Sequence, residues 1–136
     1  MPDDPERLAR IALEVATQAG ALVQGAWRSR PAATKKARVD LVTEWDLQSE
    51  RLIRRLLAER TPGIPVYAEE EGGARRAGPT WCCDPLDGTT NFVHGHPFWA
   101  VSIGLVDAGH ALAGAVVAPS LGTTWCGAAG QIPDVQ

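Results

Sequence analysis

The sequence predicts an α+β domain in which two N-terminal helices pack on an antiparallel sheet. Apolar residues recur at helical spacing as far as Arg60, whereas the second half alternates large apolar and small residues between turns. Helices that precede a run of strands usually form a separate layer from them. The 136 residues are the size of one domain, so we treat residues 1–136 as a single unit.

The first helix is expected from about Pro5 to Arg28. Asp3 or Asp4 can cap it, and Pro5 suits its first turn. Its apolar positions recur every three or four residues: Leu8, Ile11, Ala12, Val15, Ala19, Leu22, Val23 and Ala26. Residues 28–40 lack this periodicity and contain a proline, so they predict a loop.

The second helix is expected from Thr43 to Arg60. Thr43 can cap it, and Asp46 stands three residues later in a capping-box arrangement. Glu50 and Arg54 form an i,i+4 pair of opposite charge. The turn residues of 61–63 end the helix.

Short strands follow in the second half. The longest signal, residues 98–106, alternates strongly, and a turn at 107–110 makes it a hairpin with the next strand. The expected strands cover residues 64–67, 80–84, 98–106, 111–118 and part of 123–130.

Composition excludes several classes of protein. The formal net charge is −3, from 13 Lys and Arg against 16 Asp and Glu, which argues against a nucleic-acid-binding surface. No apolar stretch is long enough to span a membrane, and the N-terminus does not resemble a signal peptide. Three cysteines, two of them adjacent, do not form a disulfide framework and indicate buried thiols in a reducing cytoplasm.

Several acidic residues lie at the ends of the predicted helices and strands, where functional groups are often displayed. Asp46 opens the second helix, Glu69 and Glu70 follow a strand, and Asp84 and Asp87 end another. Turns rich in Asp-Pro and Asp-Gly are common without any function, and the bare turn alone favours that ordinary interpretation. The order of the acids makes the two interpretations about equal.

The stretch from Asp84 to Asp87 could hold metal ions if it is folded back. Three extended residues span about 10 Å, whereas two metals in one site lie about 3.5–4 Å apart. We therefore expect a sharp turn, with Pro85 fixing the backbone and the Leu86 carbonyl pointing inward between the carboxylates. Such oxygen donors suit Mg²⁺.

The residues after Asp87 could hold a phosphate. Gly88 allows a positive φ, and free backbone amides after a glycine form an anion site. Thr89 and Thr90 add hydroxyl groups. Carboxylates, metal and amide donors together indicate metal-assisted hydrolysis of a phosphate ester.

Three motifs in this sequence resemble the inositol monophosphatase family. They are "DLVTEWDLQSE" (Asp40–Glu50), "AEEEGG" (Ala68–Gly73) and "WCCDPLDGTTNFVHGHPFWAVSIGL" (Trp81–Leu105). The last is specific because it is long, ordered and contiguous. The resemblance extends from the first helix to about Gly127, and implies the N-terminal part of the layered αβαβα sugar-phosphatase fold.

The resemblance implies a role for each matching residue. Mg²⁺ would be bound by the side chains of Glu69, Asp84 and Asp87 and by the carbonyl oxygen of Leu86. The catalytic residues would be Asp46, Glu69 and Thr89. Thr89, with Asp46 behind it, would activate the attacking water. The phosphate would contact Glu69, Leu86, Asp87, Gly88, Thr89 and Thr90, with Glu70 supporting the site. No covalent phospho-enzyme is implied.

The sequence departs from the family pattern at two places. Ala68 replaces a glycine, a mild change if the backbone there keeps φ negative. The family also carries a later Trp-Asp motif, which neither Asp107 nor Asp134 matches before the sequence ends at Gln136. We therefore expect an N-terminal half, with the C-terminal half absent, that binds Mg²⁺ weakly and has little activity alone.

The resemblance thus implies a cytoplasmic, Mg²⁺-dependent phosphomonoesterase acting on a small polyol or amino-alcohol phosphate. Inositol phosphate and histidinol phosphate are the leading substrates, and a homodimer is an open expectation because such proteins are often dimers. No nucleic-acid or membrane partner is expected. The alternative is a catalytically impaired remnant that binds metal, phosphate or a protein partner.

Overall fold

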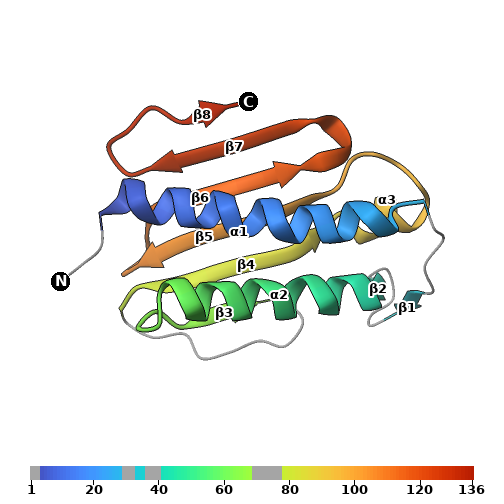
Figure 1. Cartoon of the computed structure of the whole chain (residues 1–136), viewed down its shortest axis with the longest axis horizontal. Helices are drawn as coiled ribbons and strands as arrows, with labels where there is room; N and C mark the ends of the chain where they lie inside the picture. Colours follow the sequence, from blue (N-terminus) through green and yellow to red (C-terminus); the bar gives the residue numbers. More distant parts are fainter. Residues whose placement is uncertain (1–3, 29–32, 36–40, 69–77) are drawn as a thin grey trace.

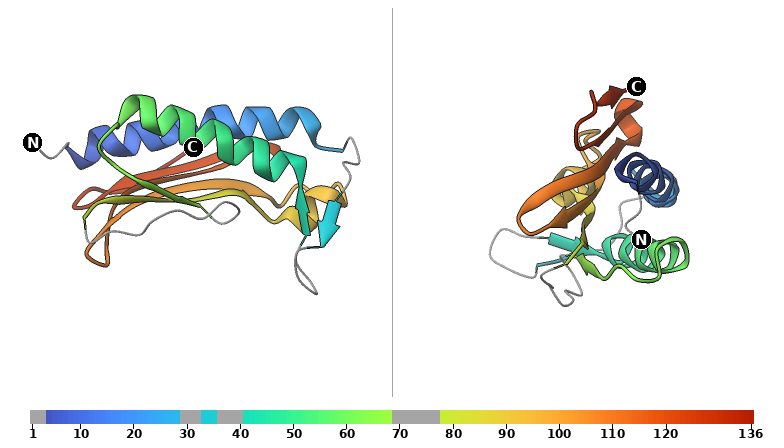
Figure 2. Two further views of the ribbon diagram at one scale, coloured as in Figure 1. Left: turned by 90° about the horizontal axis from the view of Figure 1, so that it is seen from below. Right: turned by 90° about the vertical axis from the view of Figure 1, so that its left-hand side faces the viewer.

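Two helices lie side by side on one face of a six-stranded sheet (Figures 1 and 2). The computed structural model describes residues 4–28, 33–35, 41–68 and 78–136. Helices α1 (Pro5–Ala26) and α2 (Glu44–Arg60) form the helical layer, and α3 (Thr89–Val93) is a short helix after the fourth strand. The predicted α+β class, with helices packed on a sheet, is confirmed.

The sheet has the strand order β3-β4-β5-β6-β7-β8. Its strands are β3 (Val66–Ala68), β4 (Thr80–Asp87), β5 (Ala100–Asp107), β6 (His110–Ala118), β7 (Thr123–Ala128) and β8 (Asp134–Val135). A 3-10 turn, η1 (Pro119–Leu121), joins β6 to β7. The predicted hairpin of β5 and β6 is confirmed.

The expectation of a purely antiparallel sheet is wrong at one edge. Strand β3 runs parallel to β4, with Val66 opposite Trp81 and Ala68 opposite Cys83. Parallel neighbours need a connection that carries the chain back to the starting end of the sheet. Strand periodicity alone does not reveal whether two neighbouring strands run parallel or antiparallel.

The predicted loop over residues 28–40 is also partly wrong. Strand β1 (Ala33–Lys35) lies inside it and pairs antiparallel with β2 (Leu41–Thr43), directly before α2. Three-residue strands are too short to show any periodicity. The two strands make a separate small sheet at the end of the molecule where α2 begins.

Both long helices begin as their caps predict. Asp4 is the N-cap of α1, with Pro5 in its first turn, and Thr43 and Asp46 form a complete capping box at α2. Helix α1 ends at Ala26, two residues earlier than expected, because Trp27 adopts an extended conformation and Arg28 a φ of 69°.

The core lies between the helices and the sheet. Val101, Ile103 and Leu105 of β5 point toward the helices and are buried, as are Ile53 and Leu57 of α2. Alternate residues of β5 lie on the opposite face of the sheet and are only half-buried. No helix in the described parts of the chain is long and apolar enough to cross a membrane.

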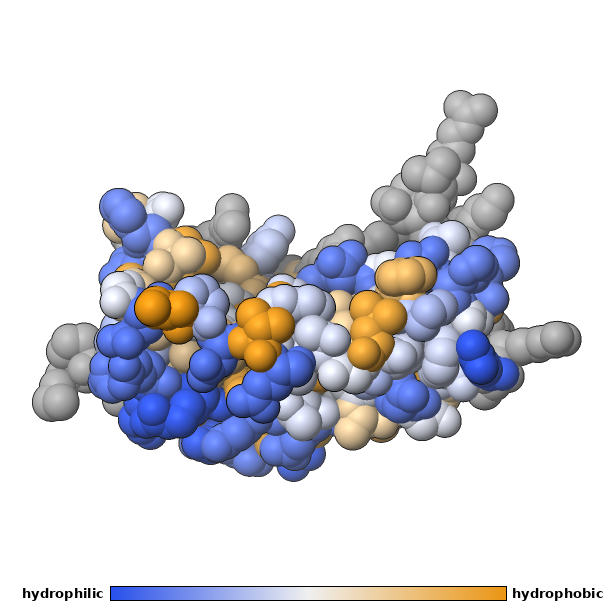
Figure 3. Space-filling model, turned by 90° about the horizontal axis from the view of Figure 1, so that it is seen from above, coloured by the Kyte–Doolittle hydropathy of each residue, from blue (hydrophilic) through white to orange (hydrophobic). Residues whose placement is uncertain are grey.

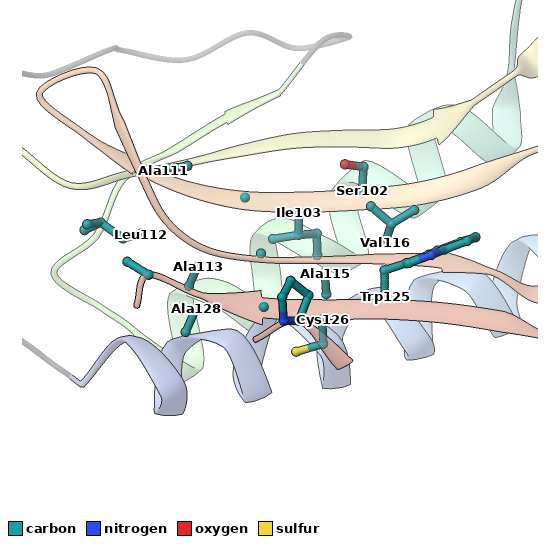
Figure 4. A pocket seen from close by; sticks show the side chains of 15 residues that line it. Ser102, Ile103, Ala111, Leu112, Ala113, Ala115, Val116, Trp125, Cys126 and Ala128 are labelled. Carbon is teal, nitrogen blue, oxygen red and sulfur yellow. The ribbon is translucent and has the colours of Figure 1, made fainter. Parts of the chain in front are cut away.

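The face of the sheet away from the helices holds a shallow apolar hollow of about 500 Å³ (Figure 4). Gly104, Gly114 and Gly127 lie in register on β5, β6 and β7 and form part of its floor. Toward the β7–β8 edge, apolar residues lie among hydrophilic ones on the surface seen in Figure 3. Val135 of β8 is 60% exposed.

Candidate active site

Several predicted site residues meet at one end of the molecule, where β4 ends and α2 and α3 begin (Figure 1). The carboxyl end of β3 points to the same end, since β3 is parallel to β4. Strand ends and helix starts therefore converge there. This arrangement displays side chains on loops that a rigid scaffold holds in place.

Asp46 is fixed by the cap of α2. Its Oδ2 accepts hydrogen bonds from the Thr43 backbone N–H at 2.9 Å and from the Thr43 hydroxyl at 2.7 Å. The side chain is buried, with the residue 1% exposed. The capping box thus leaves the second oxygen, Oδ1, to point away from the helix end toward another partner.

That partner is Thr89, 43 residues further along the chain. The Thr89 Oγ1 lies 2.8 Å from Asp46 Oδ1 and 3.1 Å from the Leu86 carbonyl oxygen. A hydroxyl has one proton to donate and two lone pairs. When Thr89 donates its proton to the carboxylate, its oxygen is left as an acceptor for a water molecule.

A β-bulge brings Asp84 and Asp87 onto one face of the sheet. Asp84 pairs with Ser102 and Asp87 with Ala100, so three steps along β4 match two along β5. Residues paired across strands share a face, and Ser102 and Ala100 are two residues apart on β5. Both carboxylates therefore lie on the face away from the helices. The expected sharp turn between Asp84 and Asp87 is wrong, because β4 continues as a strand through Asp87 and contains a bulge there instead.

Side-chain hydroxyls lie next to both carbonyl groups inside this bulge. The Leu86 oxygen lies 3.1 Å from the Thr89 oxygen, whose one proton is directed at Asp46, and the Pro85 oxygen accepts a hydrogen bond from the Ser49 hydroxyl at 2.7 Å. Ser49 is fully buried on α2. The sequence offered one signal for it, because it stands three residues after Asp46 on the same helix face.

Gly88 turns the chain from β4 into α3. Its φ is 87°, which confirms the predicted need for a positive φ. A Cβ at this position would lie 2.8 Å from the Phe98 carbonyl oxygen. Thr90, the second predicted phosphate contact, lies in the first turn of α3 and is exposed.

Glu69 and Glu70 lie outside the described residues, so their predicted roles stay predictions. Strand β3 ends at Ala68, which is paired with Cys83 and so stands beside the residue before Asp84. Ala68 lies in a regular strand and does not have a positive φ, as its replacement of glycine requires.

The oxygen donors around the bulge have the chemistry that Mg²⁺ prefers. They are the carboxylates of Asp84 and Asp87 and the carbonyl of Leu86. Within the described residues no three His, Cys, Asp or Glu side chains gather closely enough to hold a metal. The donor set fits a hard cation held partly by the backbone, with Glu69 as the predicted third carboxylate.

The charged pair of α2 extends the site toward β3. Arg54 Nε donates to Glu50 Oε2 at 3.1 Å, as the i,i+4 spacing predicts. The structure adds that Glu50 is fully buried and that Arg54 Nη1 donates to the Val66 carbonyl at 3.2 Å. The pair therefore ties the helix that carries Asp46 to the strand that precedes Glu69.

The cysteines are free thiols, as their odd number and adjacency predict. Burial raises the pKa of the Cys83 thiol to about 12, and Cys82, Glu50 and Asp84 nearby act in the same direction. Burial also raises the pKa of Cys126. A thiol that stays protonated is a poor nucleophile, so Cys83 is a packing residue beside the site.

Comparison with known proteins adds independent information. The sequence model of the inositol monophosphatase family matches residues 4–132. The inositol-1-monophosphatase SuhB of Mycobacterium tuberculosis (strain ATCC 25618 / H37Rv) is 40% identical over 147 residues, which cover 95% of this chain and 51% of that protein. Inositol monophosphatase 3 of Solanum lycopersicum is 42% identical over 105 residues, covering 74% of this chain and 39% of that protein.

Solved structures agree with this result. The extragenic suppressor protein suhB of Bartonella henselae superposes with a TM-score of 0.89 at 27% identity, covering 96% of this chain and 52% of that one. Mycobacterium tuberculosis SuhB gives a TM-score of 0.80 at 38% identity, with 98% and 49% of the two chains covered. The chain spans about half the length of the curated relatives that match most of it.

Proposed function

Because the chain belongs to the inositol monophosphatase family, we propose that it forms the metal- and phosphate-binding part of a Mg²⁺-dependent phosphomonoesterase. The contact of the Thr89 hydroxyl with the buried Asp46 carboxylate carries this proposal. A hydroxyl held on a carboxylate, next to two further carboxylates on one face of a sheet, is suited to directing water at a phosphate ester.

The substrate we propose is a small polyol or amino-alcohol phosphate. Relatives named inositol-1-monophosphatase support an inositol monophosphate, and histidinol phosphate is the second candidate. Asp84, Asp87, the Leu86 carbonyl and Glu69 would hold the Mg²⁺. When bound, the ion supplies a Lewis acid that lowers the pKa of water and offsets the charge of the phosphate.

Side chains and backbone groups of the protein orient the attacking water and bind the phosphate. The Thr89 oxygen accepts a hydrogen bond from the attacking water and so fixes its direction, while the Thr89 proton points to Asp46. Thr43 holds Asp46 with two hydrogen bonds to Oδ2, so that the carboxylate cannot rotate away. The backbone at Gly88 and the hydroxyls of Thr89 and Thr90 are the proposed phosphate contacts.

Phosphate release tests the proposal, with binding and turnover measured separately because the 136 residues span about half the length of the relatives. Inositol 1-phosphate and histidinol phosphate are offered to the chain with and without Mg²⁺. We expect slow Mg²⁺-dependent release, because the chain spans about half the length of its relatives. Thr89→Val should remove this release and Thr89→Ser should keep part of it. Equal rates in wild type and Thr89→Val would contradict the assigned role of Thr89.

The same experiment distinguishes the alternative function. Saturable Mg²⁺ binding without phosphate release would favour the alternative, a chain that binds metal and phosphate but does not turn over substrate. From the family resemblance we also propose that the protein forms a homodimer and is located in the cytoplasm. Light scattering after size-exclusion chromatography tests the dimer.

A further inference from the structure

The buried face of α2 changes its chemistry halfway along the helix. Its buried positions are Asp46, Ser49, Glu50, Ile53 and Leu57, which recur at helical spacing. The two distal members are apolar and belong to the main core, but the three proximal ones are polar. Burying a polar side chain costs free energy unless it is hydrogen-bonded, so each of these three needs a partner.

Asp46 and Glu50 have partners already described, and Ser49 has the carbonyl of Pro85. This contact is 2.7 Å long, both residues are buried, and it joins positions 36 residues apart in the chain. Pro85 and Leu86 are the residues of β4 that stand opposite a single residue of β5 in the bulge. The Pro85 carbonyl accepts a hydrogen bond from Ser49 of α2, whereas the Leu86 carbonyl lies 3.1 Å from the Thr89 hydroxyl, whose proton is directed at Asp46.

We propose that Ser49 is a positioning residue for the metal site, which it serves by anchoring the β4 bulge to α2. The inference rests on the proposed function, because it assumes that Asp84, Asp87 and the Leu86 carbonyl bind Mg²⁺. Pro85 lies between the first carboxylate and the carbonyl donor. The Ser49 hydroxyl holds the Pro85 carbonyl and so fixes the bulge relative to α2, the helix that carries Asp46. The metal donors of the bulge are thereby aligned with the Asp46–Thr89 pair.

The contact predicts a specific effect on metal affinity. Without the hydroxyl, the buried Pro85 oxygen has lost the donor it uses, and the bulge can shift to find another. Supporting groups behind metal ligands typically change metal affinity or activity by about 10- to 100-fold when removed. We expect Ser49→Ala to weaken Mg²⁺ binding by at least about 10-fold, and Ser49→Thr, which keeps the hydroxyl, to bind more tightly than Ser49→Ala.

Thr61→Val is the matched control. Thr61 is buried at the other end of α2, where its hydroxyl accepts from the Trp81 indole N–H at 2.9 Å and donates to the Leu57 carbonyl at 2.7 Å. This variant loses one hydrogen bond between the end of α2 and Trp81 of β4 and one to Leu57 within the helix, and neither involves the residues of the bulge. We expect it to lower the stability of the fold while the Mg²⁺ affinity stays within about twofold of wild type.

Mg²⁺ alone is titrated into the 136-residue wild type, Ser49→Ala, Ser49→Thr, Thr61→Val and Asp84→Asn, with tryptophan fluorescence as the readout. Urea unfolding of each variant confirms that it is folded at the titration conditions. Weaker binding in Ser49→Ala, with partial recovery in Ser49→Thr and none of the loss in Thr61→Val, supports the inference.

Three other outcomes overturn the inference and differ from one another. If wild type binds Mg²⁺, Asp84→Asn does not, and Ser49→Ala equals wild type, then Ser49 has no positioning role while the proposed function stands. If Ser49→Ala and Thr61→Val weaken binding equally, the effect is one of stability alone. Absence of saturable binding in wild type removes the metal site itself, and the positioning role with it.

Discussion

Asp46 uses its two carboxylate oxygens for two different purposes. Oδ2 caps α2 through Thr43, and Oδ1 accepts from Thr89 on a distant segment. A capping box was predictable from the sequence because it depends on residues three apart. The contact with Thr89 was implied by the family resemblance alone, since no local pattern connects positions 46 and 89.

For Ser49 the sequence offered only its position three residues after Asp46. A serine in a helix is ordinarily read as solvated, and only the buried position and the carbonyl of Pro85 show that it has a partner. The bulge itself was equally hidden. The sequence indicated that Asp84 and Asp87 had to be brought together, but the register with β5 decides how.

Gly88→Ala tests the turn into α3. The substitution places a Cβ at a φ of 87° and 2.8 Å from the Phe98 carbonyl oxygen, so the backbone must shift. We expect a loss of about 2–3 kcal/mol in the free energy of unfolding, measured by urea denaturation. Gly122→Ala is the control, because Gly122 also has a positive φ, 66°, but open space around its Cβ position. It should cost about 1 kcal/mol, and equal losses would contradict the close approach at Gly88.

Cys83 makes a prediction about pH. Its pKa is about 12 in the folded protein against 9.0 for a free thiol, because burial opposes the thiolate. Between these values the unfolded chain loses the thiol proton while the folded chain keeps it. This thiol therefore stabilises the fold fully below pH 9, and its contribution is lost as pH rises toward 12.

The measurement compares wild type with Cys83→Ala in urea unfolding at pH 7 and pH 10. Between pH 7 and pH 10 the free energy of unfolding of the wild type should fall by about 1.4 kcal/mol more than that of the variant. The reason is that from pH 9 to pH 10 the unfolded wild type has lost the thiol proton that the folded protein keeps, and one pH unit of this difference corresponds to about 1.4 kcal/mol. The comparison within each pH removes the contribution of lysine and tyrosine titration. Parallel pH profiles would show that Cys83 is not buried as described.

At the scale of elements, local patterns predicted the helices better than the strand pairings. Periodicity and caps located α1 and α2 to within two residues, because both signals lie within the helix itself. The parallel pairing of β3 and the strand β1 were missed. The pairing direction of β3 depends on where the connection leads the chain. Strand β1, with three residues, is too short to show hydrophobic alternation.

Helix α2 is the element that organises the site. Its N-terminal turns hold Asp46 and Ser49 against the end of β4, and Glu50 with Arg54 holds β3. The apolar half of the helix packs in the core and fixes its position. The polar contacts of α2 therefore fix the ends of β3 and β4, which carry the predicted metal ligands, in position relative to the core.

Arg54→Met tests this role. It removes the ion partner of a fully buried Glu50 and the donor to the Val66 carbonyl. Breaking a buried ion pair by removing one member typically costs about 3–5 kcal/mol, and we expect about 3 because Arg54 is partly exposed. Arg55→Met is the control, because the Arg55–Glu59 pair is 3.8 Å apart and mostly exposed. Urea denaturation should show almost no change for it, and a similar loss in both variants would contradict the buried link.

The whole molecule is a sheet with helices on one face and the site at one end. The described residues place no helix on the other face, which holds the apolar hollow and the row of glycines on β5, β6 and β7. Asp84 and Asp87 lie on this same open face. The family match extends over nearly the entire chain, while the chain spans about half of its relatives.

The sequence predicted the helix and sheet layers and the identity of the family. The shared face of the two aspartates follows only from the structure, because one extra residue in β4 reverses the facing of every later side chain. The proposed function depends most on joint binding of a divalent cation by Asp84 and Asp87.

Mg²⁺ titration of wild type, Asp84→Asn, Asp87→Asn and the control Asp107→Asn tests that claim most directly. Asp107 ends β5 and lies away from the bulge, next to the turn into β6. We expect a saturable change in tryptophan fluorescence that survives in Asp107→Asn and is lost in both bulge variants. An unchanged response in Asp84→Asn and Asp87→Asn would contradict joint metal binding by the two aspartates.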